Sequence, residues 1–169
     1  MSERDRSRDR TDHIEAFDST VQETYLWLKE IAAELGPEDR RLAYLALRGT
    51  LHALRDNLVI DESAQLAAQL PMLIRGIYFE GWDPSKTPAR AHHREEFLER
   101  VGRAFARAAA PIGPEQAARA VFRVLSRRIS AGEAEQVRQI LPGEVRQLWP
   151  IGDVGPGLAK PTAAGVSGG

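Results

Sequence analysis

The residues best suited to chemistry lie in one short segment of the chain. Residues 78–82 (YFEGW) place three aromatic rings beside a carboxylate and a glycine. Aromatic rings gathered at a helix end can line a pocket or bind a protein partner. The alternative is that Tyr78 and Phe79 complete a hydrophobic core and that Trp82 covers a linker. The candidate interaction surface consists of Arg75, Tyr78, Phe79, Glu80 and Trp82.

Two arginines, Arg75 and Arg146, each follow a Leu-Pro step. A guanidinium can bind a carboxylate or a phosphate of a ligand. The alternative is an ion pair within the chain, with a carboxylate such as Glu62 or Glu133. Because the arginine occurs in both halves of the chain, we favour the structural pair.

The four histidines do not predict a metal site. A site needs two or more converging ligands, for example residues four apart on one helix face. His52 and Asp56 have that spacing, but it arises often by chance, and no HExxH motif is present. His92 and His93 are adjacent in a predicted loop. We therefore expect no metal and no cofactor.

Arginines also recur along two predicted helices. Such stripes are usually solvated helix faces, and no aromatic stacking platform or recognition-helix motif accompanies them. The net charge of −1 also argues against nucleic-acid binding, which normally requires a basic excess. Nucleic acid is therefore an unlikely partner, kept as a weak alternative. The arginines concerned are Arg41, Arg48 and Arg55, with Arg123, Arg127 and Arg128.

Catalytic motifs are missing from the sequence, which contains no GxSxG, GxGxxG or GxxxxGK[ST] pattern and no cysteine. We expect a protein that is not an enzyme. The N-terminus is charged throughout and no apolar run approaches the ~18 residues that span a bilayer. The expected location is the cytoplasm, without a membrane partner.

The elements that position these residues are predicted to be helices. Phe17, Val21, Tyr25 and Leu28 recur at three- and four-residue steps, which predicts one buried helix face. Thr20 and Glu23 have the spacing of a capping box at the start of this helix. Further helices follow Gly36–Pro37 and Gly113–Pro114, and a Pro interrupts a helix at 71 and at 142.

The two halves of the chain match when one is shifted by 71 residues. Leu70–Pro71 falls on Leu141–Pro142, and Arg75 falls on Arg146. This predicts an all-α, compact domain of two tandem three-helix units, with the third helix of each broken at the Leu-Pro step. The predicted organisation is a disordered charged tail (1–16), a first unit (17–82), a linker (83–93), a second unit (94–150) and a disordered tail (151–169).

Five segments of the chain are LALRGTLHALRDNL, AAQLPMLIRGIYFEGWDPSKTP, REEFLERV, AVFRVLSRRIS and LPGEVRQLWP. Together they resemble the bacterial family called domain of unknown function 2267. The resemblance covers about residues 17–150 and is most specific at residues 69–84. It implies an all-α fold and brings no established activity, cofactor or catalytic residue.

Three functions remain open from the sequence. The first is a non-enzymatic interaction or regulatory module whose partner surface lies near residues 78–82, with homo-oligomers possible. The second is a small-molecule or metal-binding protein with its site in the groove between the two units. The third is weak nucleic-acid binding through arginine-rich helix faces.

Overall fold

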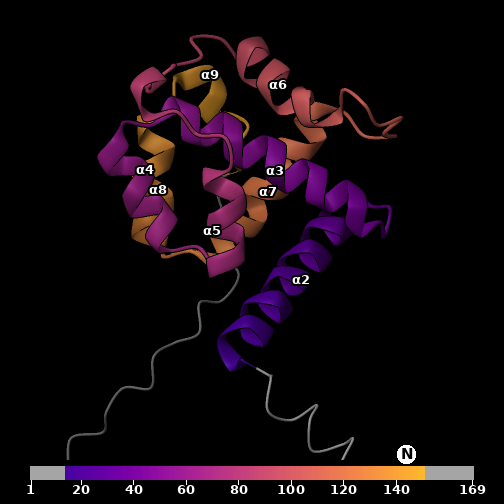
Figure 1. Ribbon diagram of the computed structural model, residues 1–169. Helices are drawn as coiled ribbons and strands as arrows, with labels where there is room; N and C mark the ends of the chain where they lie inside the picture. The colour runs from indigo at the N-terminus through magenta and orange to yellow at the C-terminus, as the bar shows by residue number, and fades with distance from the viewer. Residues whose placement is uncertain (1–13, 151–169) are drawn as a thin grey trace, which may run out of the picture.

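The computed structural model describes residues 14–150, which form helices and no strands (Figure 1). The predicted all-α fold is confirmed. The elements are α2 (Glu15–Leu35), α3 (Arg40–Asn57), α4 (Ile60–Ala68), α5 (Met72–Phe79), η1 (Pro84–Lys86), α6 (Arg94–Gly102), η2 (Arg103–Phe105), α7 (Pro114–Arg128), α8 (Ala131–Ile140) and α9 (Gly143–Arg146).

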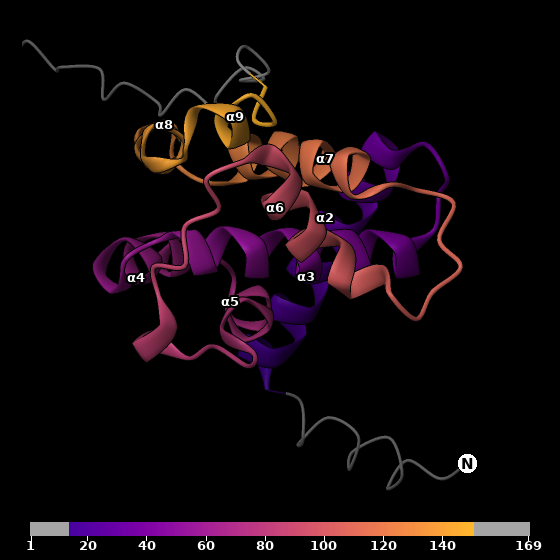
Figure 2. The ribbon, with the colours of Figure 1, turned by 90° about the horizontal axis from the view of Figure 1, so that it is seen from above.

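Helix α3 is the central element, because it packs against α2, α5, α6 and α7. Figure 2 shows α7, α8 and α9 on one side of α3 and α5 on the other. The side chain of Asp39 caps the helix by accepting from the backbone N–H groups of Arg41 and Leu42. Leu47, Leu51 and Leu54 follow the helical period and are fully buried. The hydrophobic core therefore forms around α3.

Both predicted helix breaks occur at the Leu-Pro steps. Helix α4 ends at Ala68 and Pro71 precedes α5, while Pro142 separates α8 from α9. Proline cannot donate the hydrogen bond that would continue the preceding helix. The equivalent arginines accordingly have structural roles, but their predicted carboxylate partners are wrong.

The partners of these arginines are carbonyl groups at the ends of α4 and α8. Arg75 donates from Nε to the carbonyl oxygen of Ala67 at 2.9 Å and from Nη2 to that of Leu70 at 3.0 Å. Arg146 donates from Nη2 to Gln139 and Leu141. The last carbonyls of a helix have no partner within the helix and carry partial negative charge, so a cation suits this position.

The sequence prediction for α2 is wrong at its N-terminal end. The helix begins at Glu15, so the predicted capping box at Thr20 is not formed; Thr20 instead accepts a hydrogen bond from the backbone of Leu73. Phe17, Val21 and Tyr25, predicted to be buried, are exposed. Both figures show this end of α2 extending past the other helices, and its apolar side chains are exposed among the described residues.

The predicted domain boundaries are only partly described. The predicted tail 151–169 lies wholly outside the described residues, and so does most of the predicted tail 1–16. Residues 15–16, assigned to that first tail, are helical. The predicted linker, residues 83–93, contains the short helix η1. The duplication stays a prediction. Gln65 and Gln136, which are 71 residues apart, contact each other through Nε2 of Gln136 and Oε1 of Gln65, 3.0 Å apart.

Helices α3 and α6 approach each other closely at Gly49. A Cβ atom at this position would lie 2.5 Å from the carbonyl oxygen of Val101 and 2.9 Å from Cβ of Ala104. The first contact is with backbone, which cannot rotate away as a flexible side chain can. The absence of a side chain at Gly49 therefore allows the close approach of α3 and α6.

We expect Gly49→Ala to destabilise the protein by about 1–3 kcal/mol, because the added methyl group must push α6 away from α3. Gly76→Ala is the matched control, since a Cβ there meets nothing within 4 Å. The control should be more stable by about 0.5–1 kcal/mol, because Ala is the better helix former. Urea unfolding followed by circular dichroism measures both. Equal effects of the two substitutions would contradict the role given to Gly49.

Candidate functional site

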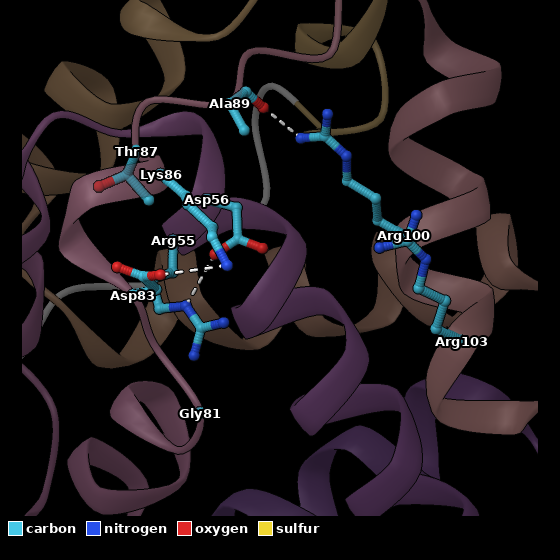
Figure 3. Close-up of a pocket in the computed structure, with 9 residues that line it drawn as sticks. All are labelled: Arg55, Asp56, Gly81, Asp83, Lys86, Thr87, Ala89, Arg100 and Arg103. Atoms are coloured by element: carbon cyan, nitrogen blue, oxygen red, sulfur yellow. Dashed lines mark hydrogen bonds and ion pairs between the residues drawn. The ribbon is translucent and has the colours of Figure 1, made fainter.

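A cavity of about 340 Å³ opens between α3, the loop that leads from α5 to α6, and the α6–η2 segment. Figure 3 shows Arg100 and Arg103 along one edge, across from Arg55 and Lys86. The cavity is lined by Arg55, Asp56, Gly81, Asp83, Lys86, Thr87, Ala89, Arg100 and Arg103.

A second cavity of about 210 Å³ adjoins the first, and the two share Arg55, Asp56, Arg100 and Arg103. It adds Arg48, Gly49, His52, Ala53 and Ala104 to the lining. We call the two together the arginine cleft. The close contact of α3 with α6 at Gly49 lies in this cleft, so the same contact that joins the helices also shapes it.

The side chain of Arg55 is almost fully buried at the inner end of the cleft. Its Nη1 donates to the carbonyl oxygens of Tyr78, at 2.8 Å, and Glu80, at 2.9 Å. Its Nε donates to Asp56 at 3.0 Å. A buried charge is tolerated when it is paired and hydrogen-bonded in this way. Arg55 thus links the C-terminal end of α5 to α3 through hydrogen bonds.

Two further cations of the cleft are paired with carboxylates at its rim. Arg48 donates to Glu80, 3.2 Å away, and this hydrogen bond lowers the pKa of the Glu80 carboxyl. Lys86 lies 3.2 Å from Asp83. The pKa of Asp83 is also lowered, first by the hydrogen bond from the hydroxyl of Ser85 and then by Lys86. These carboxylates stay ionised and offset the two cations.

Arg100 and Arg103 are not offset in this way. They lie three residues apart at the end of α6, so their side chains extend from the same side of the helix. Arg100 donates to the backbone carbonyl of Ala89. Within residues 14–150, the side chain of Arg103 makes no hydrogen bond or ion pair. Their charges face the cleft without a carboxylate partner, which leaves the cleft with a positive excess.

His52 lines the second cavity, with Nε2 at 2.7 Å from the carbonyl oxygen of Ile77. A carbonyl only accepts, so Nε2 carries the hydrogen. Burial lowers the pKa of His52 below its ordinary value, the hydrogen bond to Ile77 opposes this, and Arg55 and Arg48 lower it further. The imidazole is therefore neutral near pH 7.

The residues of the predicted interaction surface are divided between the core and the surface. Tyr78 is fully buried, its hydroxyl lies 2.7 Å from that of Ser63, and burial raises its pKa to about 12. Phe79 and Trp82 are partly buried with ring centroids 5.1 Å apart, and Glu80 is exposed. The side chain of Arg75 donates to a carbonyl group at the end of α4. The interaction surface at residues 78–82 stays a prediction. Tyr78 contributes no exposed side chain to it.

Sequence reasoning singled out neither Lys86, Arg100 nor Arg103. Of the cleft residues it named Arg48 and Arg55 as a basic stripe and His52 with Asp56 as a helical pair. The spacing of Arg100 and Arg103 was the one available signal, and it is common on solvated helices.

Within the described part of the chain, no three histidine, cysteine or acidic residues group as metal ligands. None of its helices has the length and apolar character to cross a membrane.

The chain is similar to one described family. The profile of the uncharacterized conserved protein family DUF2267 matches residues 24–148. The chain belongs to this family. The match includes every residue of the arginine cleft, so the cleft lies in the DUF2267 region. No curated protein matches the chain.

In this DUF2267 protein, we expect Arg55→Met to lower the free energy of unfolding by about 2–4 kcal/mol, because two carbonyl groups and Asp56 lose their donor. Arg48→Met is the control: it removes a partly exposed ion pair, and exposed pairs contribute less than about 1 kcal/mol. Urea unfolding measures both variants. If Arg48→Met lowered the free energy of unfolding as much as Arg55→Met, burial would not be what makes the contribution of Arg55 large.

The lowered pKa of His52 predicts a pH dependence of stability. The unfolded state binds the proton at the ordinary pKa of about 6.5, while the folded state binds it only at lower pH. Wild-type stability should therefore decrease as the pH falls from about 6.5 toward the folded-state pKa, and His52→Gln should lack this contribution. Comparing urea unfolding of the two proteins at about pH 7.5 and 5.5 tests this. A constant difference between them would refute it.

Proposed function

We propose that this protein is a non-enzymatic binding module whose arginine cleft takes a small anionic ligand with phosphate or carboxylate groups. The observation that carries the proposal is the pair Arg100 and Arg103 at the edge of a cavity of about 340 Å³, with no carboxylate paired to either within residues 14–150. Guanidinium groups bind planar and tetrahedral oxyanions through parallel hydrogen bonds.

The charge balance of the cleft supports an anion over a cation. Three of its five basic side chains, Arg48, Arg55 and Lys86, have a carboxylate partner. The other two do not, so a bound anion would complete the balance. The size of the cleft suits a compact ligand, since small-molecule sites are typically about 300–1,000 Å³.

The placement of the cleft also supports the proposal. One wall is α3 and the other is α6–η2, so the cleft lies between the predicted first and second units. A small-molecule site between the two units was one of the alternatives that the sequence left open. The loop that contains Gly81 and Asp83 forms a third side, and Arg55 fixes its start. A ligand would therefore contact three segments that are distant in the sequence.

Binding of a protein partner at residues 78–82 is the second candidate. The partly buried ring pair of Phe79 and Trp82 favours it, because amphipathic aromatic rings are frequent at binding hot spots. Trp82→Ala would then weaken capture of a partner without unfolding the protein. Unfolding of Trp82→Ala would assign the residue to the core.

The proposal is tested by titrating the full chain with inorganic pyrophosphate in a calorimeter. Arg103→Gln should weaken binding at least about tenfold, because a charge-assisted hydrogen bond contributes about 1.5–3 kcal/mol. Since the side chain of Arg103 makes no hydrogen bond or ion pair within residues 14–150, its replacement should not change the thermal unfolding. Higher ionic strength should weaken binding by the wild type.

The matched control is Arg107→Gln, which removes an exposed arginine four residues further along that does not line the cleft. This variant should bind pyrophosphate as the wild type does. Equal weakening by both substitutions would indicate non-specific attraction to positive charge. Absence of binding of phosphate, pyrophosphate and citrate by the wild type would overturn the proposal.

A further inference from the structure

The exposed apolar side chains of residues 14–150 are concentrated at the N-terminal end of the described chain. Five of the nine large ones lie on α2 or at its N-cap. Four of these, at spacings of three, four and four, fall on one side of the helix. Their exposed fractions range from 41% to 57%. We call Ile14, Phe17, Val21 and Tyr25 the α2 strip.

The strip continues onto a neighbouring helix. The backbone N–H of Leu73 donates to the hydroxyl oxygen of Thr20 at 2.9 Å, which holds the start of α5 against α2. Met72 and Leu73, at that start, are 55% and 41% exposed. An apolar surface made by two elements of a protein commonly marks an interaction site.

We propose that a second copy of this chain covers the α2 strip, with the two α2 helices antiparallel about a two-fold axis near Val21. A two-fold axis requires one surface to be complementary to itself. Antiparallel pairing places Phe17 of one copy opposite Tyr25 of the other. Because the strip follows the helical period, its side chains pack between those of the second helix.

The charges beside the strip determine this orientation. Glu15 and Asp18 make the first turn of α2 acidic. At the other end of the strip, the guanidinium of Arg40 lies 5.4 Å from the centre of the Tyr25 ring. The antiparallel arrangement brings Arg40 of one copy to the acidic first turn of the other. A parallel arrangement would bring the two acidic turns together.

The acidic first turn of α2 also argues against a membrane surface or a nucleic acid as the partner that covers the α2 strip. An anionic membrane surface attracts helices whose polar face is basic, and nucleic acid requires a basic surface. A second copy offers both the apolar strip and the opposite charge. The interface uses α2 and α5 residues that do not line the arginine cleft, so self-association and anion binding can be tested separately.

Cross-linking tests the contact directly, because the chain contains no cysteine. Val21→Cys lies near the two-fold axis and should form a disulfide-linked dimer on mild oxidation. Ile60→Cys is the control: Ile60 is 50% exposed at the start of α4, away from the strip, and should stay unlinked. Equal cross-linking of both variants, or none at Val21→Cys, would overturn the proposal.

Sedimentation velocity of the full chain tests association and orientation. The wild type should be a dimer, and Phe17→Glu should be a folded monomer with the helical circular dichroism of the wild type, since Phe17 is 57% exposed. Arg40→Glu should weaken the dimer at least fivefold, and Asp18→Arg in the same chain should restore it. A monomeric wild type would overturn the proposal, and failure of the restoration would overturn the antiparallel orientation.

Discussion

The contact between α3 and α6 at Gly49 is the constraint on which the functional part of this structure depends. With no side chain at Gly49, the backbone of Val101 can lie against α3, and a Cβ atom there would be only 2.5 Å from its carbonyl oxygen. The contact sets the separation of the two walls of the arginine cleft. It also sets the positions of Arg100 and Arg103, because Arg100 lies in the last turn of α6 and Arg103 follows it directly. A larger residue at position 49 would therefore change stability and cleft shape together.

The arginines of this protein have different roles because their environments differ. Arg75 and Arg146 bind the carbonyl ends of α4 and α8, and Arg55 binds two carbonyl oxygens next to α5, so these guanidinium groups are part of the architecture. Arg48 pairs with Glu80 at the rim of the cleft. Arg103 has none of these partners within residues 14–150. The proposed anion site is supported by the guanidinium of Arg103, which is available to a ligand, and not by the number of arginines nearby.

Local features of the sequence predicted the helices and their breaks, because a missing backbone donor at Pro71 or Pro142 acts within one turn. The periodicity of α2 predicted an apolar face correctly but could not show what covers it, and Phe17 and Tyr25 are exposed where the body of the protein ends. The cleft could not be predicted either. Arg103 has an ordinary spacing in the sequence, and it becomes a site residue only because α6 packs against α3.

The claim that the arginine cleft binds an anion is tested most directly by nuclear magnetic resonance of the arginine Nε–H groups during titration with inorganic pyrophosphate. Each group reports separately on its own guanidinium. We expect the largest saturable shifts at Arg103 and Arg100, with little change at Arg107 or Arg41, which do not line the cleft. Shifts of similar size at all exposed arginines, or none at Arg103, would contradict it.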